Sequence, residues 1–352
     1  MTGPLLEARE LRVRFHAGRG KQPVRAVDGV DLAVGRGEIV ALVGESGCGK
    51  TTLARTLLGL ERPQDGTVLF DGAPLGYGSG DLKRYRRRAQ LILQDPTGAL
   101  NPRQTVYESV AEGLRIHRTV ARKQREGSDT TEVDLVSAAL AKAGLRPPEG
   151  FFMTYPHELS GGQRQRVVIA GALALEPELL VADEPVSSLD ASIRGEILAL
   201  LLRLRDELGL TVLVVTHDLG LAWNIADRIA VMYLGRIVEV GSTEEVLQAP
   251  EHPYTQALLS VVPEVEEIEP VVLAGEPPDP SRIPDGCRFH PRCQALAGGA
   301  AEAAGVADRC ISDPLPVIAA HGEHRAACWL AEARSDQPWR KPPDGGRLLT
   351  DP

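Results

Sequence analysis

One stretch of the sequence has the residue types and the spacing that bind phosphate: Gly44, Glu45, Ser46, Gly47, Cys48, Gly49, Lys50, Thr51 and Thr52. It fits the pattern G-x-x-x-x-G-K-[ST] with nothing missing. Glycines let backbone N–H groups close around the β- and γ-phosphates of a nucleotide. Lys50 would then reach the outer phosphates, and the Thr51 hydroxyl would ligate Mg²⁺. The simpler alternative is a Gly-rich turn that binds nothing.

The segments on either side of this loop favour the phosphate site. Ile39 to Val43 is a short apolar, β-branched run of the kind that forms a buried strand. Lys50 to Leu60 has leucines at helical spacing and no proline, so we expect a helix there. A strand, a Gly-rich loop and a helix in this order place the positive end of the helix dipole against the phosphates.

A second group of chemically useful residues follows another apolar run. Leu179 to Ala182 predicts a buried strand, and Asp183 and Glu184 come directly after it. At a strand end Asp183 can hold Mg²⁺ through water, and Glu184 is placed to polarise an attacking water. An acidic pair is modest evidence alone, but it becomes strong in a chain that also carries the phosphate loop.

The elements around these groups predict an α/β fold. We expect an edge strand over Leu5 to Phe15 and a buried strand over Leu91 to Gln94. Val106 to Gly144 is mainly helical in pattern. Ile229 to Tyr233 and Arg236 to Val240 read as a hairpin. Alternating strands and helices between these segments indicate a parallel sheet with its site at the strand C-termini.

Composition excludes several classes of protein. The chain has 352 residues, of which 43% are hydrophobic, enough to bury a substantial core. No apolar run approaches the ~18 residues of a membrane span, and the N-terminus has no apolar signal-peptide core. The net charge of −9 argues against a general affinity for nucleic acid. We therefore expect a cytosolic protein without a nucleic-acid partner.

Six motifs in register give the chain a family resemblance. Besides the phosphate loop and the acidic pair they are Gln94, Leu159 to Gln163, Ser188 to Asp190, and His217. Together they resemble the nucleotide-binding subunit of an ABC transporter over roughly residues 5 to 250. The resemblance implies a P-loop NTPase of the ABC type in residues 1–250, with a mixed-sheet core, an antiparallel β subdomain and a helical subdomain at about 95–160. A Pro- and Cys-rich C-terminal extension follows in residues 251–352.

The same resemblance implies ATP and Mg²⁺ as ligands and a role for each matching residue. Two such subunits pack head to tail, so that Ser160, Gly161, Gly162 and Gln163 of one subunit cap the ATP held by the other, and Asp190 crosses the interface. Alternatively Ser160 is only a helix cap. Gln94 would sense the γ-phosphate and Mg²⁺, His217 would hold Glu184 and the water in geometry, and Phe15 is the candidate to stack on adenine. Ser188 stands where the family often has Ala.

A narrower resemblance concerns the cargo. Gln94-Asp95-Pro96, Leu100-Asn101-Pro102, His252 to Thr255 and Gly286 to Cys293 resemble the oligopeptide and dipeptide importer ATPases. This implies a second ATPase subunit, with a paralogue favoured, two transmembrane permease subunits, an extracellular solute-binding protein, and a peripheral position on the cytoplasmic face of the membrane. Nickel importers share much of the pattern. Two other readings are a soluble ABC ATPase acting on nucleic acid or ribosomes and a non-hydrolysing regulatory subunit.

Four of the five cysteines lie in the last quarter of the chain: Cys287, Cys293, Cys310 and Cys328. In the cytosol such clustering points to metal or redox chemistry before disulfides. Four unrelated thiols is the simpler alternative. Structural zinc sites usually pair ligands at C-x₂₋₄-C, and no such pair is present, although His290, His321 and His324 could serve in a zinc site. The peptide-importer resemblance implies a 4Fe-4S cluster held by the four cysteines.

Overall fold

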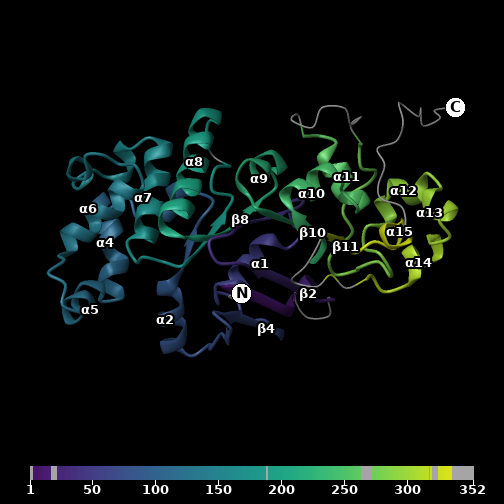
Figure 1. Cartoon of the computed structure of the whole chain (residues 1–352), viewed down its shortest axis with the longest axis horizontal. Coiled ribbons are helices and arrows are strands. Elements are labelled where there is room, and N and C mark those ends of the chain that lie inside the picture. Colours follow the sequence, from purple (N-terminus) through teal and green to yellow (C-terminus); the bar gives the residue numbers. More distant parts are fainter. Residues whose placement is uncertain are drawn as a thin grey trace.

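The structure is a computed structural model that describes residues 3–16, 22–187, 189–262, 271–316, 318 and 324–334. Ser188 and His321, both singled out in the sequence, lie outside these residues. Two β-sheets form the centre of the molecule, a group of helices lies at one end, and the segment after residue 250 lies at the other (Figure 1).

The smaller sheet is antiparallel with the strand order β2-β1-β4-β5. Its strands are β1 (Leu6–Phe15), β2 (Val24–Val34), β4 (Asp65–Phe70) and β5 (Ala73–Pro74). The prediction of an edge strand at residues 5–15 was wrong, because Leu6 pairs with Val34 on one side and with Phe70 on the other. Alternating side chains reveal which face of a strand is buried, but not how many strands lie beside it.

The larger sheet has the order β11-β10-β9-β3-β8-β7-β6. Its strands are β3 (Ile39–Val43), β6 (Ala89–Ile92), β7 (Leu179–Asp183), β8 (Thr211–Thr216), β9 (Arg228–Tyr233), β10 (Arg236–Ser242) and β11 (Arg325–Ala326). Strands β6 to β9 and β3 pair in parallel, and β9, β10 and β11 pair antiparallel. Residues of β3, β7 and β8 are buried throughout, as expected for parallel strands covered on both faces. The strand predicted to reach Gln94 ends at Ile92, so Gln94 lies in the following loop.

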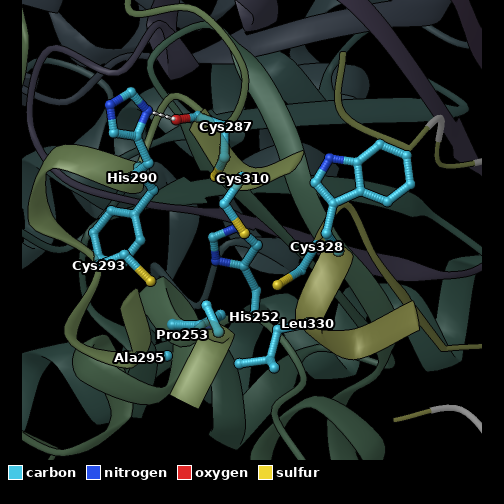
Figure 2. Close-up of a pocket in the computed structure, with 12 residues that line it drawn as sticks. His252, Pro253, Cys287, His290, Cys293, Ala295, Cys310, Cys328 and Leu330 are labelled. Carbon is cyan, nitrogen blue, oxygen red and sulfur yellow. Dashed lines mark hydrogen bonds between the residues drawn. The ribbon is translucent and has the colours of Figure 1, made fainter. Parts of the chain in front are cut away.

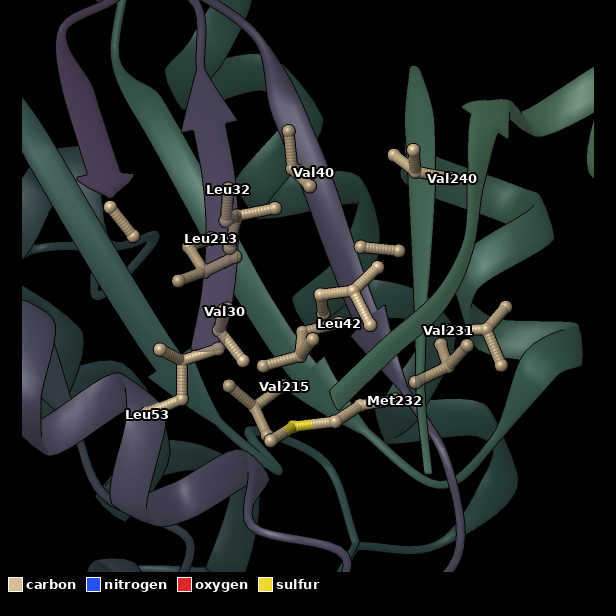
Figure 3. Close-up of a cluster of buried hydrophobic side chains, with 14 of the residues drawn as sticks. Val30, Leu32, Val40, Leu42, Leu53, Leu213, Val215, Val231, Met232 and Val240 are labelled. Carbon is tan, nitrogen blue, oxygen red and sulfur yellow. The ribbon is translucent and has the colours of Figure 1, made fainter. Parts of the chain in front are cut away.

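Ten helices named here belong to the part before residue 250. They are α1 (Lys50–Leu57), α2 (Ser79–Arg88), α3 (Pro96–Ala99), α4 (Val106–Ile116), α5 (Thr119–Arg125), α6 (Glu132–Lys142), α7 (Gly161–Leu173), α8 (Ala191–Leu208), α9 (Leu219–Ile225) and α10 (Thr243–Gln248), with short 3₁₀ turns η1 (Pro148–Phe151) and η2 (Pro156–Glu158). Helices α4, α6 and α7 bury Leu114, Leu140 and Ala170 in one core, which also takes in residues of β7 and β8 from the larger sheet. A second core lies between α1 and both sheets, where Val30, Leu42 and Leu53 meet (Figure 3).

The segment after residue 250 packs on the rest of the chain. It contains α11 (Pro253–Leu259), η3 (His290–Arg292), α12 (Gln294–Ala297), α13 (Ala300–Ala303), α14 (Ala307–Ser312) and α15 (Trp329–Arg334). Tyr254 and Phe289 are buried in the same core as the sheets, and β11 extends the edge of the larger sheet. Ala301, Val306, Cys310, Cys328 and Leu330 form a small core of their own. Within the described residues, no helix is long and apolar enough to cross a membrane.

Candidate functional site

The phosphate loop connects β3 to α1 and approaches neighbouring backbone so closely that only glycine fits at two positions. Gly44 has a φ of 151°, and a Cβ there would lie 2.2 Å from the carbonyl oxygen of Met232. Gly49 has a φ of 110°, and its Cβ would lie 2.0 Å from the carbonyl oxygen of Ala26. The loop therefore packs tightly against β2 and β9, and this packing fixes the conformation of its backbone and so the directions of its N–H groups.

Lys50 begins α1 with its side chain folded back over the loop. Its ammonium group donates hydrogen bonds to the carbonyl oxygens of Gly44, at 2.6 Å, and Glu45, at 2.9 Å. The residue is 6% exposed, so its charge is aimed inward and not into bulk solvent. An ammonium group in this position is available to the outer phosphates of a nucleotide lying along the loop.

Thr51 and Asp183 form the metal side of the site. The Thr51 hydroxyl donates to the Asp183 carboxylate over 3.3 Å, although the two residues come from α1 and the end of β7. Burial raises the pKa of Asp183, and the hydrogen bond from Thr51 opposes this only in part. Two adjacent oxygen ligands, one a buried carboxylate, suit a hard divalent cation such as Mg²⁺.

Glu184 is held by side chains from two other loops. Its backbone has a φ of 47°, an uncommon value outside glycine, and its N–H donates to the carbonyl oxygen of Val215 at 2.8 Å. Gln94 Nε2 donates to Glu184 Oε2 at 3.1 Å, and His217 Nδ1 is bonded to Glu184 Oε1 at 2.9 Å. Each carboxylate oxygen is thus oriented by a separate group, and the predicted neighbours do meet around one acid.

An open cleft of about 280 Å³ runs along the loop. Besides loop residues, Gln94 and Glu184, it is lined by Val24, Arg25, Ala26, Leu234, Gly235 and Pro280. Sequence reasoning missed these six, because nothing in their types marks a site and only the packing of β2, the β9–β10 turn and the late segment brings them together. Phe15 does not line this cleft; it pairs with Val24, which does, and it is 41% exposed.

The Leu-Ser-Gly-Gly-Gln segment lies at the start of α7, and among the described residues that line the cleft none comes from it. Ser160 is the N-cap of α7: its hydroxyl accepts from the Gln163 N–H at 3.2 Å, and Gln163 Oε1 accepts from the Ser160 N–H at 2.9 Å. Ser160 and Gly161 are exposed. Asp190, the exposed N-cap of α8, makes no side-chain hydrogen bond to that helix. Ser160 thus caps the helix while it remains at the exposed surface, and Gly162 is buried.

The four late cysteines line a single pocket, together with His252 and His290 (Figure 2). They come from segments up to 41 residues apart in sequence, positions 287 to 328. Burial raises the pKa of Cys287 and of Cys328 to about 12, and it also raises the pKa of Cys293 and Cys310. In the part of the chain that the structure describes, no three His, Cys, Asp or Glu side chains have the geometry of a site for a metal ion.

The histidines near this pocket differ in their bonding. His252 is 1% exposed, and its Nδ1 accepts the N–H of Tyr254 at 3.0 Å, so the ring proton resides on Nε2. That Nε2 has no hydrogen-bond partner among the described residues. His290 Nδ1 is bonded to the carbonyl oxygen of Cys287 at 2.9 Å. His324 does not line the pocket and is bonded to Glu239 at 2.7 Å.

A phosphate loop, an acidic pair at a strand end and a capped Leu-Ser-Gly-Gly-Gln helix in this arrangement define a P-loop ATPase of the ABC class. Comparisons with known proteins agree. The chain matches the ABC transporter family over residues 27–187 and the oligopeptide/dipeptide transporter C-terminal region over residues 238–297. It is 44% identical over 296 residues to the putative oligopeptide transport ATP-binding protein YkfD of Bacillus subtilis, covering 82% of this chain and 87% of that protein. It is 42% identical over 298 residues to the dipeptide transport ATP-binding protein DppF of Haemophilus influenzae, covering 82% and 88%.

Solved structures agree with the sequence relatives. CbiO1 of Clostridium perfringens, part of an ABC transporter complex, aligns with a TM-score of 0.60 at 30% identity, covering 70% of this chain and 91% of that one. The dimeric ABC transporter cassette MJ0796 aligns with a TM-score of 0.58 at 28% identity, covering 68% and 98%. This chain therefore belongs to the ABC transporter family, among the ATP-binding proteins of oligopeptide and dipeptide transporters. It is an ATPase subunit that works with ATP and Mg²⁺.

Proposed function

We propose that this chain hydrolyses ATP to energise the import of oligopeptides or dipeptides through a membrane ABC transporter. One observation carries the proposal: the ABC transporter region is followed, in the same chain, by a segment matching the C-terminal region of oligopeptide/dipeptide transporters. The relatives named for peptide transport extend over both parts of the chain.

In this function Glu184 orients and polarises the water that attacks the γ-phosphate. Gln94 and His217 hold its two carboxylate oxygens, which supports their assignment as positioning residues. Lys50 exchanges its present bonds to loop carbonyls for bonds to the phosphates. Thr51 and Asp183 would hold Mg²⁺, which would neutralise charge on the phosphates, and Gln94 lines the same cleft as Thr51.

The active assembly is a head-to-tail pair of ATPase subunits, with a paralogue as the second one. Ser160 and Gly162 then act on the ATP of the partner subunit, which agrees with the exposure of Ser160 and with the lining of this chain's own cleft, whose described residues include neither of them. The pair binds two transmembrane permeases on the cytoplasmic face of the membrane, and an extracellular binding protein delivers the solute. Phe15, which pairs with the cleft residue Val24 and lies outside the cleft lining itself, stacks on adenine at its edge, and Asp190 contributes to the interface between the ATPase subunits.

Cys287, Cys293, Cys310 and Cys328 hold a 4Fe-4S cluster with a structural or regulatory role. Support comes from the pocket that all four line and from His252, which also lines it and whose buried Nε2–H has no acceptor among the residues that the structure describes. Such a donor suits the sulfur atoms of a cluster. Iron, sulfide and zinc analysis after anaerobic purification tests this, and one zinc without iron would leave zinc as the ligand.

Glu184→Gln tests the catalytic assignment. The change keeps the size of the side chain and one of its two acceptor oxygens and removes its charge, so ATP binding should persist while turnover falls by at least ~100-fold. Normal turnover of an assembled transporter carrying this variant would show that hydrolysis occurs elsewhere.

Reconstitution tests the transport assignment. The chain is purified with its permeases and binding protein, and uptake into vesicles is measured with labelled di- and oligopeptides and with Ni²⁺. ATP-dependent uptake of peptide supports the proposal. Uptake of Ni²⁺ alone, or recovery with ribosomes or DNA instead of permeases, would contradict it.

A further inference from the structure

The phosphate loop is held by two residues that follow residue 250. The backbone N–H of Glu45, within the loop, donates to the Tyr254 hydroxyl at 2.8 Å. The Glu45 carboxylate accepts two hydrogen bonds from Arg292, at 2.8 Å from Nη1 and 3.1 Å from Nη2. On its third side the Glu45 carbonyl oxygen accepts from Lys50. One loop residue is therefore fastened through its N–H, its carbonyl and its side chain.

Both anchoring residues are buried within or beside a cluster of three aromatic rings. The Arg292 side chain is 6% exposed and its η3 turn lies between Cys287 and Cys293. The rings of Tyr233, Tyr254 and Phe289 contact one another with centroid distances of 4.6, 5.3 and 5.4 Å. A planar guanidinium bound at both nitrogens fixes the direction of a carboxylate as well as its position. Because Arg292 is packed within the late segment, its two hydrogen bonds fix the position of Glu45 in the phosphate loop relative to that segment.

The charges of Arg292 and Glu45 are expected to affect nucleotide binding. Glu45 places a negative charge in the loop that must wrap a polyanion, and Arg292 is the cation bound to that carboxylate on both oxygens. Without Arg292 the carboxylate would repel the phosphates and lose the orientation that turns it away from them. Glu45 is also absent from the residues lining the cleft, as expected if its side chain points towards Arg292.

We propose that Arg292 and Tyr254 are positioning residues of the ATP site, which fix the phosphate loop and neutralise Glu45. The segment after residue 250 is then a part of the ATP-binding apparatus as well as an appendage to it. The inference rests on ATP binding by this chain and is independent of the cargo and of what the cysteines hold.

Arg292→Ala tests the proposal in the full chain assembled with its partner subunits. The Michaelis constant for ATP should rise about tenfold with kcat changed less than about threefold, the pattern of lost binding that is shared by ground and transition states. Arg292→Lys, which retains the charge and not the paired hydrogen bonds, should fall between Arg292→Ala and the wild type. Tyr254→Phe should also raise the Michaelis constant, because it leaves the Glu45 N–H without its acceptor.

A rescue variant separates positioning from simple loss of folding. Adding Glu45→Gln to Arg292→Ala removes the uncompensated charge, so it should restore at least half of the lost ATP affinity while restoring little thermal stability. Arg228→Ala is the matched control, because Arg228 forms a partly buried pair with Glu38 at 3.3 Å, and the side-chain hydrogen bonds that it makes to described residues go to Ala33 and Glu38, outside the phosphate loop. It should lower thermal stability and leave the Michaelis constant unchanged.

Two results would overturn the proposal. One is an unchanged Michaelis constant in Arg292→Ala, with a loss of thermal stability like that of Arg228→Ala. The other is equal ATP affinity in Arg292→Ala with and without Glu45→Gln. If Arg292→Ala does not fold, Arg292→Gln, which also removes the charge, takes its place in both comparisons. A wild-type chain that bound no ATP would refute the proposed function instead, so the two failures are distinguishable.

Discussion

Replacing Arg288 by Met should weaken the attachment of the segment after residue 250 to the antiparallel sheet. The Arg288 side chain is 7% exposed and pairs with Asp28 of β2, which is 8% exposed. Its Nη1 also donates to the carbonyl oxygen of Leu234. Methionine is unbranched and flexible, so it fills most of the vacated space and the variant removes mainly charge and hydrogen bonds.

The size of the effect follows from what remains around Asp28. Removing one member of a buried ion pair costs about 3–5 kcal/mol, because the other charge stays buried without its partner. Arg12 and Arg25 lie 3.8 and 3.7 Å from the Asp28 carboxylate and would compensate in part. We therefore expect the lower end of the range, a decrease of about 3 kcal/mol in the free energy of unfolding.

Urea unfolding followed by tryptophan fluorescence measures this decrease, and Trp329 reports from the late segment itself. Arg84→Met is the matched control, because Arg84 is 82% exposed and pairs with Asp81. Its loss should cost less than about 1 kcal/mol. A decrease in Arg288→Met no larger than in the control would refute the view that this ion pair fastens the segment to the domain.

The same pair makes a prediction about pH. Burial opposes ionisation of Asp28, but the hydrogen bond and charge of Arg288 outweigh it and lower the pKa. An acid whose pKa is lowered on folding stabilises the protein above its unfolded pKa of about 3.9 and loses that contribution as the pH falls through the folded value. The wild type should therefore exceed Arg288→Met in stability at pH 7, and the difference should shrink in acid below pH of about 4.

Three further predictions test other parts of the structure. Gly49→Ala should abolish ATP binding in an equilibrium nucleotide-binding assay, because its Cβ would overlap the carbonyl oxygen of Ala26; retained affinity would contradict the loop geometry. Gly162→Ala brings a Cβ within 2.7 Å of Ile193, so ATPase activity of the assembled pair should fall while ATP binding by the isolated chain is unchanged. Burial lowers the pKa of His252 to about 4, so stability should decline as the pH falls from about 6.5 towards 4. His252→Asn keeps an acceptor at this helix cap and should flatten that decline in urea titrations at several pH values.

Much of the nucleotide site was predictable because its signals are local. The phosphate loop, Asp183 and Glu184 each follow a strand whose apolar run is visible in the sequence, and Ser160 caps a helix as its residue type predicts. The hairpin of β9 and β10 was confirmed as well. The edge position of β1 was wrong, since the number of neighbouring strands depends on where β4 returns, which no local pattern records.

By itself the sequence determined which chemically active residue types this protein carries and how they are spaced. Residue type and spacing fix a glycine loop that can approach phosphates, a strand that ends in two carboxylates, and four cysteines in a region where thiols are concentrated. Only the tertiary structure decided which distant residues complete the site. Arg292 meets Glu45, Arg288 meets Asp28 and Pro280 lines the cleft because the late segment folds back onto β2 and the loop. Arg292 and Glu45 are 247 positions apart in the sequence. The periodicity of apolar residues predicts local helices and strands, so it carries no information about which residues meet across such a separation.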